Sequence, residues 1–89
     1  MEFEWDSDKN DETLQKRGFD FVFAALIFGG ETIEAEDARR DYGETRMRAL
    51  GEAEGSILVV VYTDREDARR IISARAASRK ERRQWQSRG

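Results

Sequence analysis

The spacing of apolar and polar residues changes several times along the chain, and each change marks an element. Residues 3–5 alternate between apolar and polar side chains, which predicts a short strand. Asp6 or Ser7 can then cap a helix through its side-chain oxygen, and Gly18 stands where a left-handed C-cap is expected. The pattern therefore predicts a first helix over residues 7–17.

The longest apolar run extends from Phe21 to Phe28 and stops at two glycines. Asp20 can cap a helix over residues 21–28, although a run of this length could equally form a buried strand. We favour the helix. In either conformation the run should form the centre of the core, because full burial of each large apolar side chain contributes roughly 1.5–3 kcal/mol.

From residue 31 onward the pattern is typical of strands separated by turns. The predicted strands cover residues 31–37, 44–53, 57–62 and 70–72, with turns at 54–55 and 65–68. The run at 57–62 is continuously apolar and rich in β-branched residues, which predicts a central strand buried on both faces.

Ser78 and Glu81 have the spacing of a capping box, so a terminal helix should begin there. The order of elements predicts an α+β fold with a short N-terminal strand, two helices, a four-stranded antiparallel meander and a C-terminal helix. We expect the helices on one side of the sheet. A chain of 89 residues is too short for two cores, so residues 1–89 should form a single domain.

The sequence contains no cysteine and no histidine. A disulfide, a thiolate nucleophile and a cysteine-bound metal are thereby excluded, and a zinc site is not expected. The N-terminus is acidic where a signal peptide would be basic, and the longest apolar run is too short to cross a bilayer. We therefore expect a soluble cytoplasmic protein with no cofactor and no membrane partner.

The net charge of −3 conceals a strong asymmetry along the chain. Residues 1–64 carry seven Lys and Arg against sixteen Asp and Glu, a net charge of −9. Residues 65–89 carry nine against three, a net charge of +6. A basic segment this local sets up a positive field on one part of the surface, which is typical of proteins that bind a polyanion.

Seven basic residues fall between positions 69 and 83: Arg69, Arg70, Arg75, Arg79, Lys80, Arg82 and Arg83. Most are arginine, whose planar fork pairs bidentately with phosphate. A solvated helix face balanced by the acidic half accounts for the composition about equally well. A basic helix could also dock on an acidic partner protein, so composition alone leaves three interpretations open.

The order of several motifs resembles that of the BrnT family. These motifs are FEWD at 3–6, Lys9, KRGFDF at 16–21, RRDYGETR at 39–46, VVYT at 60–63 and RRIISARAASRKER at 69–82. The resemblance implies a RelE-like ribonuclease fold and an endoribonuclease toxin of a type II toxin–antitoxin pair. It also implies a cognate BrnA-like antitoxin with a ribbon-helix-helix domain, through which alone operator DNA would be contacted.

The resemblance further implies that a ribose 2′-hydroxyl attacks the neighbouring phosphate without help from a metal ion. Matching positions nominate Arg46, Arg70 and Arg75 as a clamp for the charge that develops on phosphorus. Glu44 lies two residues before Arg46, on the same face if both are in a strand, and is the preferred base. A surface ion pair with Arg46 explains Glu44 at least as well.

Further contacts to the RNA backbone are expected from Arg17, Arg40, Arg69, Arg79, Arg82 and Arg83. Many relatives have histidine at the positions of Arg17 and Arg40. Arginine there preserves phosphate binding but stays protonated at any ordinary pH, so it cannot replace histidine in proton transfer. Catalysis then depends on arginine or is lost, and a non-catalytic interaction module of the same fold is the alternative function.

Four other residues have competing interpretations. Tyr62 could donate a proton, but a strand tyrosine is more often part of the core. Glu81 is better explained by the capping box, and Trp5 by the core. Trp85 could stack on a base, but we favour a role in sealing the last helix against the sheet.

Overall fold

One mixed sheet organises the computed structural model, which describes residues 1–88. The elements are β1 (Glu2–Trp5), α1 (Ser7–Arg17), α2 (Phe21–Ala24), a 3₁₀ helix η1 (Ala25–Gly29), β2 (Thr32–Glu36), β3 (Met47–Ala53), β4 (Ser56–Arg65), β5 (Ala68–Ala76) and α3 (Arg79–Gln86). No helix in this part of the chain has the length and apolar character needed to cross a bilayer.

The sheet has five strands in the order β1-β5-β4-β3-β2, one more than the predicted four-stranded meander, because the N-terminal strand joins it. Strands β2 to β5 pair with their neighbours in antiparallel fashion, but β1 joins the outer edge of β5 in parallel. Phe3 of β1 lies opposite Arg69 of β5. The two strands that pair are the first and the last in the chain, and no local pattern reveals such a distant partner.

The first helix spans residues 7–17, as predicted. Asp6 caps it by accepting hydrogen bonds from the Asp8 and Lys9 amides, at 2.9 and 3.1 Å. Gly18 ends it in the left-handed conformation, with φ of 80°. These contacts satisfy amides and carbonyls that a helix end otherwise leaves without partners.

The predicted helix over residues 21–28 is divided into a single α-helical turn and a 3₁₀ segment that extends to Gly29. Asp20 caps its start by accepting from the Phe23 amide at 3.0 Å. Phe21 and Ile27 are fully buried, so the prediction that this run forms the centre of the core is confirmed. The tighter 3₁₀ winding aligns Ile27 with β3. Tertiary packing, and not local propensity, therefore determines the change from α to 3₁₀ winding.

Strand boundaries differ most where the strands are polar. The third strand begins at Met47, so Glu44 and Arg46 lie in the preceding loop and not in the predicted strand over 44–53. The last strand covers Ala68–Ala76, nine residues where three were predicted over 70–72. Arginine and serine interrupt its apolar alternation, because one of its faces is lined with polar side chains.

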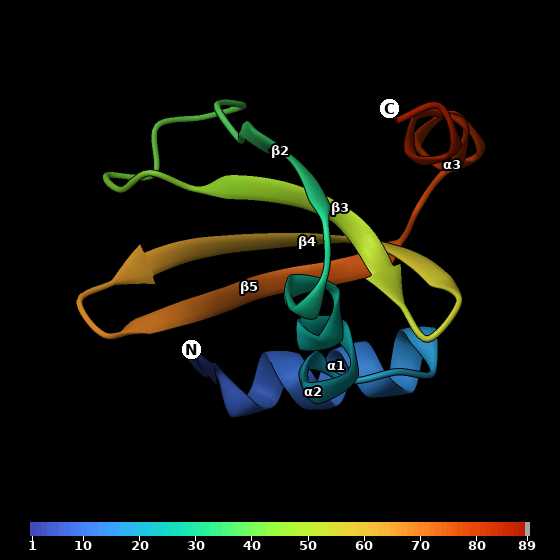
Figure 1. Ribbon diagram of the computed structural model, residues 1–89. Helices are drawn as coiled ribbons and strands as arrows, with labels where there is room; N and C mark the ends of the chain where they lie inside the picture. Colours follow the sequence, from blue (N-terminus) through green and yellow to red (C-terminus); the bar gives the residue numbers. More distant parts are fainter. Residues whose placement is uncertain (89) are drawn as a thin grey trace.

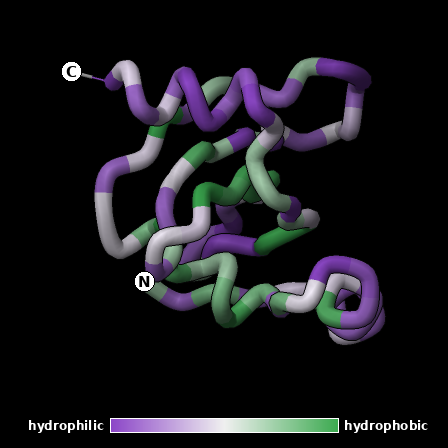
Figure 2. The backbone as a smooth tube through the Cα atoms, turned by 90° about the vertical axis from the view of Figure 1, so that its right-hand side faces the viewer, coloured by the Kyte–Doolittle hydropathy of each residue, from purple (hydrophilic) through white to green (hydrophobic). Residues whose placement is uncertain are grey.

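Helices cover both faces of the sheet, and the prediction that they lie on one side is wrong (Figure 1). Leu58, Val60 and Tyr62 of β4 pack with α2 on what we call the α2 face. Val59 and Leu50 pack with Trp85 of α3 on the opposite, α3 face. Figure 2 likewise places α3 and α1 on opposite sides of the strands. Since β4 is apolar on both faces, as predicted, each face needs a cover.

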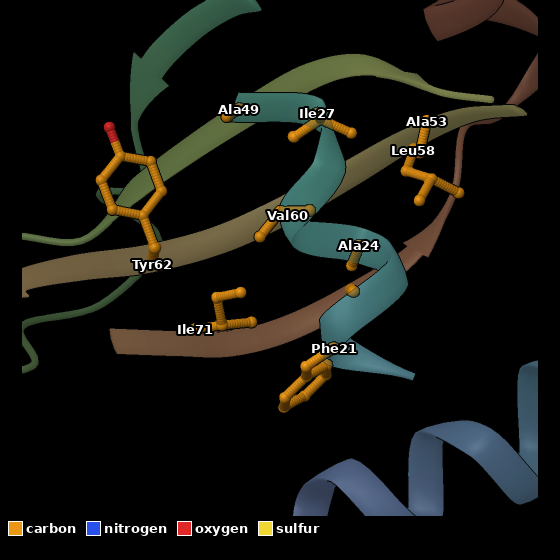
Figure 3. Packing of buried hydrophobic residues seen from close by; sticks show 10 residues of the cluster. Phe21, Ala24, Ile27, Ala49, Ala53, Leu58, Val60, Tyr62 and Ile71 are labelled. Atoms are coloured by element: carbon orange, nitrogen blue, oxygen red, sulfur yellow. The ribbon is translucent and has the colours of Figure 1, made fainter. Parts of the chain in front are cut away.

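The larger core fills the α2 face, where β3, β4 and β5 meet α2 and η1 (Figure 3). Trp5 packs edge-on against Phe21, with ring centroids 6.0 Å apart, so its core position is confirmed. Trp85 is 4% exposed and packs with Leu50 and Val59, which confirms that it seals α3 against the sheet.

Gly51 is where η1 approaches β3 most closely. A Cβ atom at this position would lie 2.9 Å from the Ile27 Cβ atom and 3.2 Å from the Thr32 Cγ2 atom. We expect Gly51→Ala to lower the free energy of unfolding by about 1–3 kcal/mol, the usual cost of overpacking a dense core. Urea unfolding measures this, and Gly30→Ala is the control, since nothing lies within 4 Å of a Cβ atom there. Equal stability of Gly51→Ala and the parent would contradict the close approach.

Candidate active site

A β-bulge determines where the arginines of β5 point. Residues 70 and 75 are an odd number of positions apart, so in a regular strand their side chains would lie on opposite faces. The register of β5 against β4 shifts between Val61 and Tyr62. As a result Arg70 lies opposite Thr63 and Arg75 opposite Val59, and both side chains belong to the α3 face. Bulges of this kind commonly re-aim side chains beside functional sites.

Glu44, in the loop before β3, contacts arginines at the edge of the α3 face. Its carboxylate lies 3.2 Å from the Arg46 Nε atom and 3.8 Å from the Arg65 Nη2 atom. Arg65 is the last residue of β4 and points to the same face as Val59 and Thr63. This small cluster therefore lies at the end of the α3 face that is far from α3. Glu44 and Arg46 are thus in contact, as both the catalytic and the ion-pair interpretations require.

The Arg46 guanidinium also lies over the Tyr42 ring, 3.9 Å from its centroid, and Arg40 approaches the same ring at 5.9 Å. Arg40, Tyr42, Glu44 and Arg46 line one cleft of about 340 Å³. Arg40 and Arg46, two of the arginines that the sequence nominated, therefore share a cleft with the nominated carboxylate.

Each proposed clamp arginine has a carboxylate partner in the free protein. Arg46 is paired with Glu44, Arg70 lies 3.8 Å from Glu4, and Arg75 donates to both oxygens of Glu81 at 2.7 and 2.9 Å. A phosphate must displace or share these partners. The long Arg70 contact is the weakest of the three and leaves that guanidinium most available.

Glu81 has two structural roles. It completes the capping box of α3 with Ser78, as predicted, and it binds Arg75 bidentately. The hydrogen bonds from Arg75, opposed by partial burial and aided by Ser78, lower the pKa of the Glu81 carboxyl from 4.5 to about 2. A depressed pKa means that the folded state favours the ionised form, so this pair stabilises the protein above the unfolded pKa.

Acid should therefore weaken the fold through Glu81. As pH falls from about 5 to about 2, the contribution of this carboxylate is lost, and we expect a cost of about 2 kcal/mol after allowance for solvent screening. Glu81→Gln should show a correspondingly smaller loss of unfolding free energy over the same range. Thermal melts at both pH values measure the difference, and parallel pH profiles for the two proteins would refute it.

Arg69 lies on the other face of the sheet from Arg70 and Arg75. Its guanidinium pairs with Asp64 at 2.7 and 3.1 Å and stacks over the Tyr62 and Phe28 rings, at 4.0 and 4.8 Å. Tyr62 is 3% exposed, which confirms its packing role, and its hydroxyl donates to Glu34. Burial and this hydrogen bond raise the pKa of Tyr62 to about 12. The Arg69–Tyr62 group is remote from the α3 face.

The remaining nominated arginines lie toward the other end of the sheet. Arg17 and Arg82 line a cleft beside Ser56, at the opposite end of β4 from Arg65. Arg79 and Arg83 are exposed on α3. These four residues form a basic rim around one end of the molecule, separated along the strands from Arg46 and Glu44.

Two residues of the α3 face escaped the sequence analysis. Arg48 lies opposite Val61, on the same face as Arg70 and Arg75, and Tyr42 stacks with Arg46. The alternation of 46, 48 and 50 was a usable signal for Arg48, since it puts these residues on one face. No sequence signal pointed to Tyr42. Within residues 1–88, no three His, Asp or Glu side chains are grouped as metal ligands would be.

Comparison with known proteins gives one finding. The model of a family described as the ribonuclease toxin, BrnT, of type II toxin-antitoxin systems matches residues 5–81, which is most of the chain. No curated protein matches the sequence. The matched segment contains all the residues nominated for the clamp, together with Glu44 and Arg48.

Proposed function

The chain belongs to the BrnT family of type II toxin–antitoxin ribonuclease toxins, and from this premise we propose that it is a metal-independent endoribonuclease in which Arg46, Arg70 and Arg75 bind the scissile phosphate. The observation that carries this proposal is the bulge in β5, which puts Arg70 and Arg75 on one face despite their odd spacing. The same register shift puts Ile71 and Ala74 together in the core of the α2 face, so one feature determines both the packing and the direction of the arginines. We also propose that the fold is RelE-like and that residues 1–89 act as one toxin domain.

The proposed reaction begins with a ribose 2′-hydroxyl. Glu44 takes the proton from this hydroxyl, whose oxygen then forms a bond to phosphorus while the bond from phosphorus to the 5′-oxygen breaks. The products are a 2′,3′-cyclic phosphate and a 5′-hydroxyl. The 5′-oxygen takes its proton from water, and the hydroxide that remains takes the proton from Glu44. The arginines neutralise charge on the phosphoryl oxygens, the role that metal ions fill in other nucleases.

Further arginines extend the proposed surface that binds the RNA backbone. Arg40 lies in the cleft with Arg46, and Arg17, Arg79, Arg82 and Arg83 form the basic rim at the other end of the sheet. We leave Arg69 out of this surface, because it is paired with Asp64 on the α2 face. Binding through several phosphates should weaken steeply as salt is added.

The chemical products provide a direct test. Purified protein should cleave an RNA oligomer at neutral pH and at the same rate with or without EDTA, leaving a 2′,3′-cyclic phosphate. A 2′-O-methyl group at the cleaved position should block the reaction. Arg75→Ala is run alongside to reveal contaminating nuclease. Absence of cleavage, or equal cleavage by both proteins, would remove the enzymatic assignment.

We further propose that a cognate BrnA-like antitoxin with a ribbon-helix-helix domain covers the α3 face in the cytoplasm and forms a hetero-oligomer with the toxin. Operator DNA would then be bound only through the antitoxin. The basic segment over residues 65–89, with a net charge of +6, supports an acidic partner surface. If the adjoining gene encodes no such protein, this part of the proposal fails.

A second candidate is a non-catalytic module that binds the antitoxin without turning over RNA. It is favoured by the pairing of Arg46, Arg70 and Arg75 with carboxylates and by the absence of histidine from the sequence. The two candidate functions predict different effects on cell growth. Expression without antitoxin should arrest growth if the protein is a ribonuclease and should have no effect if it is the module.

A further inference from the structure

A small cavity opens on the α3 face between the sheet and α3. Its volume is about 90 Å³, and its apolar wall is formed by Ile33, Leu50 and Val59. One ordered water needs roughly 10–15 Å³ of such space, so the cavity has room for a small planar group but not for a whole nucleotide. Charged and amide side chains complete the lining of the cavity.

Four polar residues line the same cavity: Glu34 from β2, Arg48 from β3, and Glu81 and Gln84 from α3. The Glu34 carboxylate already accepts hydrogen bonds from the Thr32 and Tyr62 hydroxyls. Glu81 already accepts hydrogen bonds from Arg75 and from the Ser78 amide. The free groups are therefore mainly donors, namely the Arg48 guanidinium and the Gln84 amide. A planar ligand with two adjacent acceptors fits this arrangement.

Arg48 is half-buried, and within residues 1–88 its guanidinium forms no ion pair. Five other arginines on or beside this face, Arg39, Arg46, Arg65, Arg70 and Arg75, each have a carboxylate partner. Among the described residues, Arg40 is the exception near Arg46, and it lies over the Tyr42 ring instead of in the cavity. The charge of Arg48 acts on Asp37 only at longer range, so its guanidinium donors stay available for a ligand.

The cavity also adjoins the proposed clamp. Glu81 belongs to its wall and holds Arg75, whose strand neighbour Val59 forms part of the apolar wall. An RNA strand whose phosphate reaches Arg75 therefore passes beside the opening. Proteins that read RNA sequence commonly take an unstacked base out of the strand and hydrogen-bond its edge.

We propose that this cavity binds a guanine base next to the cleaved phosphodiester, with Arg48 donating to O6 and N7. The inference rests on the proposed ribonuclease function and adds a base preference to it. Guanine is the base whose paired acceptors arginine most often reads, through its two-pronged guanidinium. Ile33 and Val59 enclose the ring, and Gln84 supplies a further donor and acceptor.

Cleavage of four matched oligomers tests this proposal. They share one cleavable linkage, all other 2′-hydroxyls being methylated, and differ only in placing G, A, C or U beside it. We expect the G oligomer to be cleaved about tenfold faster than the others, a typical discrimination for one bidentate contact. Arg48→Ala should abolish the preference. Arg48→Lys should abolish it too, because lysine keeps the charge but lacks the fork.

Lys16→Ala is the matched control, since it removes a positive charge from α1 on the other side of the sheet and should keep the preference. Equal cleavage of all four oligomers by the parent, a preference for another base, or a preference that survives Arg48→Ala would overturn the proposal while the ribonuclease function stands.

If the protein cleaves no RNA at all, nucleotide binding can still test the guanine pocket separately from the ribonuclease function. Trp85 packs on Leu50 and Val59, the apolar wall of the cavity, so its indole N–H resonance reports on occupancy. Guanosine monophosphate should shift this resonance at lower concentration than the other three nucleotides, and Arg48→Ala should remove the difference. Guanine-selective binding without any cleavage would refute the ribonuclease and retain the pocket. Equal shifts by all four nucleotides would refute the pocket.

Discussion

Phe21→Ala should lower the free energy of unfolding by about 3–5 kcal/mol, the usual cost of removing a buried aromatic ring. The Phe21 side chain is fully buried and lies against the Trp5 ring and the strands of the α2 face (Figure 3). The backbone contact at this position is independent of the ring, since the Phe21 amide donates to Asn10 at 2.7 Å. The loss therefore reports on packing alone.

Thermal unfolding measures this effect directly. A domain of this size loses about 4–8 °C in Tm for each kcal/mol, so a fall of about 15–30 °C is expected. Val22→Ala is the matched control, because Val22 is the next residue in the same helical turn and is 60% exposed. If both substitutions lower Tm by the same amount, the core is not centred where the α2 face meets α2.

The sequence predicted local features well because their causes are local. The cap at Asp6, the left-handed Gly18 and the capping box of Ser78 and Glu81 each depend on a few neighbouring residues, and all three are confirmed. The buried β4 was equally readable, because apolar residues on both of its faces leave no other interpretation.

Features that depend on distant contacts were not predicted. Nothing near β1 indicates that it pairs with β5, and nothing near α3 indicates which face it covers. Trp85 was correctly expected to seal the last helix against the sheet, but the sequence did not indicate which face of the sheet it would seal. Within residues 1–88, Trp85 is the one buried residue of α3, and a single residue is a weak periodic signal.

In the candidate site, too, local features could be predicted and features that depend on distant contacts could not. Arg70 and Arg75 lie on the α3 face, but spacing in the sequence could not separate Arg69 from Arg70, nor put Arg70 and Arg75 together. A bulge inverts the alternation without leaving a mark in the composition of β5. Glu44 and Arg46 were expected in a strand and lie in a loop, where they meet through side-chain contact instead of through strand geometry.

Arg70→Ala should lower the single-turnover rate constant for RNA cleavage by about 10²–10³-fold, the effect of losing one donor aimed at developing charge. Arg70 lies on the α3 face, and within the described residues its one ion pair is a 3.8 Å contact with Glu4, so its removal should cost under about 1 kcal/mol of stability. Rapid-quench kinetics measures the rate, and release from growth arrest in cells without antitoxin is the corresponding phenotype.

Arg69, the neighbour of Arg70 in the sequence, is the control that tests whether the direction of the side chain matters. Arg69→Ala removes the same charge from the α2 face, together with stacking over Tyr62 and the bidentate contact with Asp64. This variant should lose stability but, below its Tm, should cleave RNA within about twofold of the parent, because adjacent strand residues point to opposite faces. Arg70→Lys should be intermediate, since it keeps the charge without the planar fork. If Arg69→Ala and Arg70→Ala slow cleavage equally, the arginines act through net charge and the clamp on the α3 face is wrong.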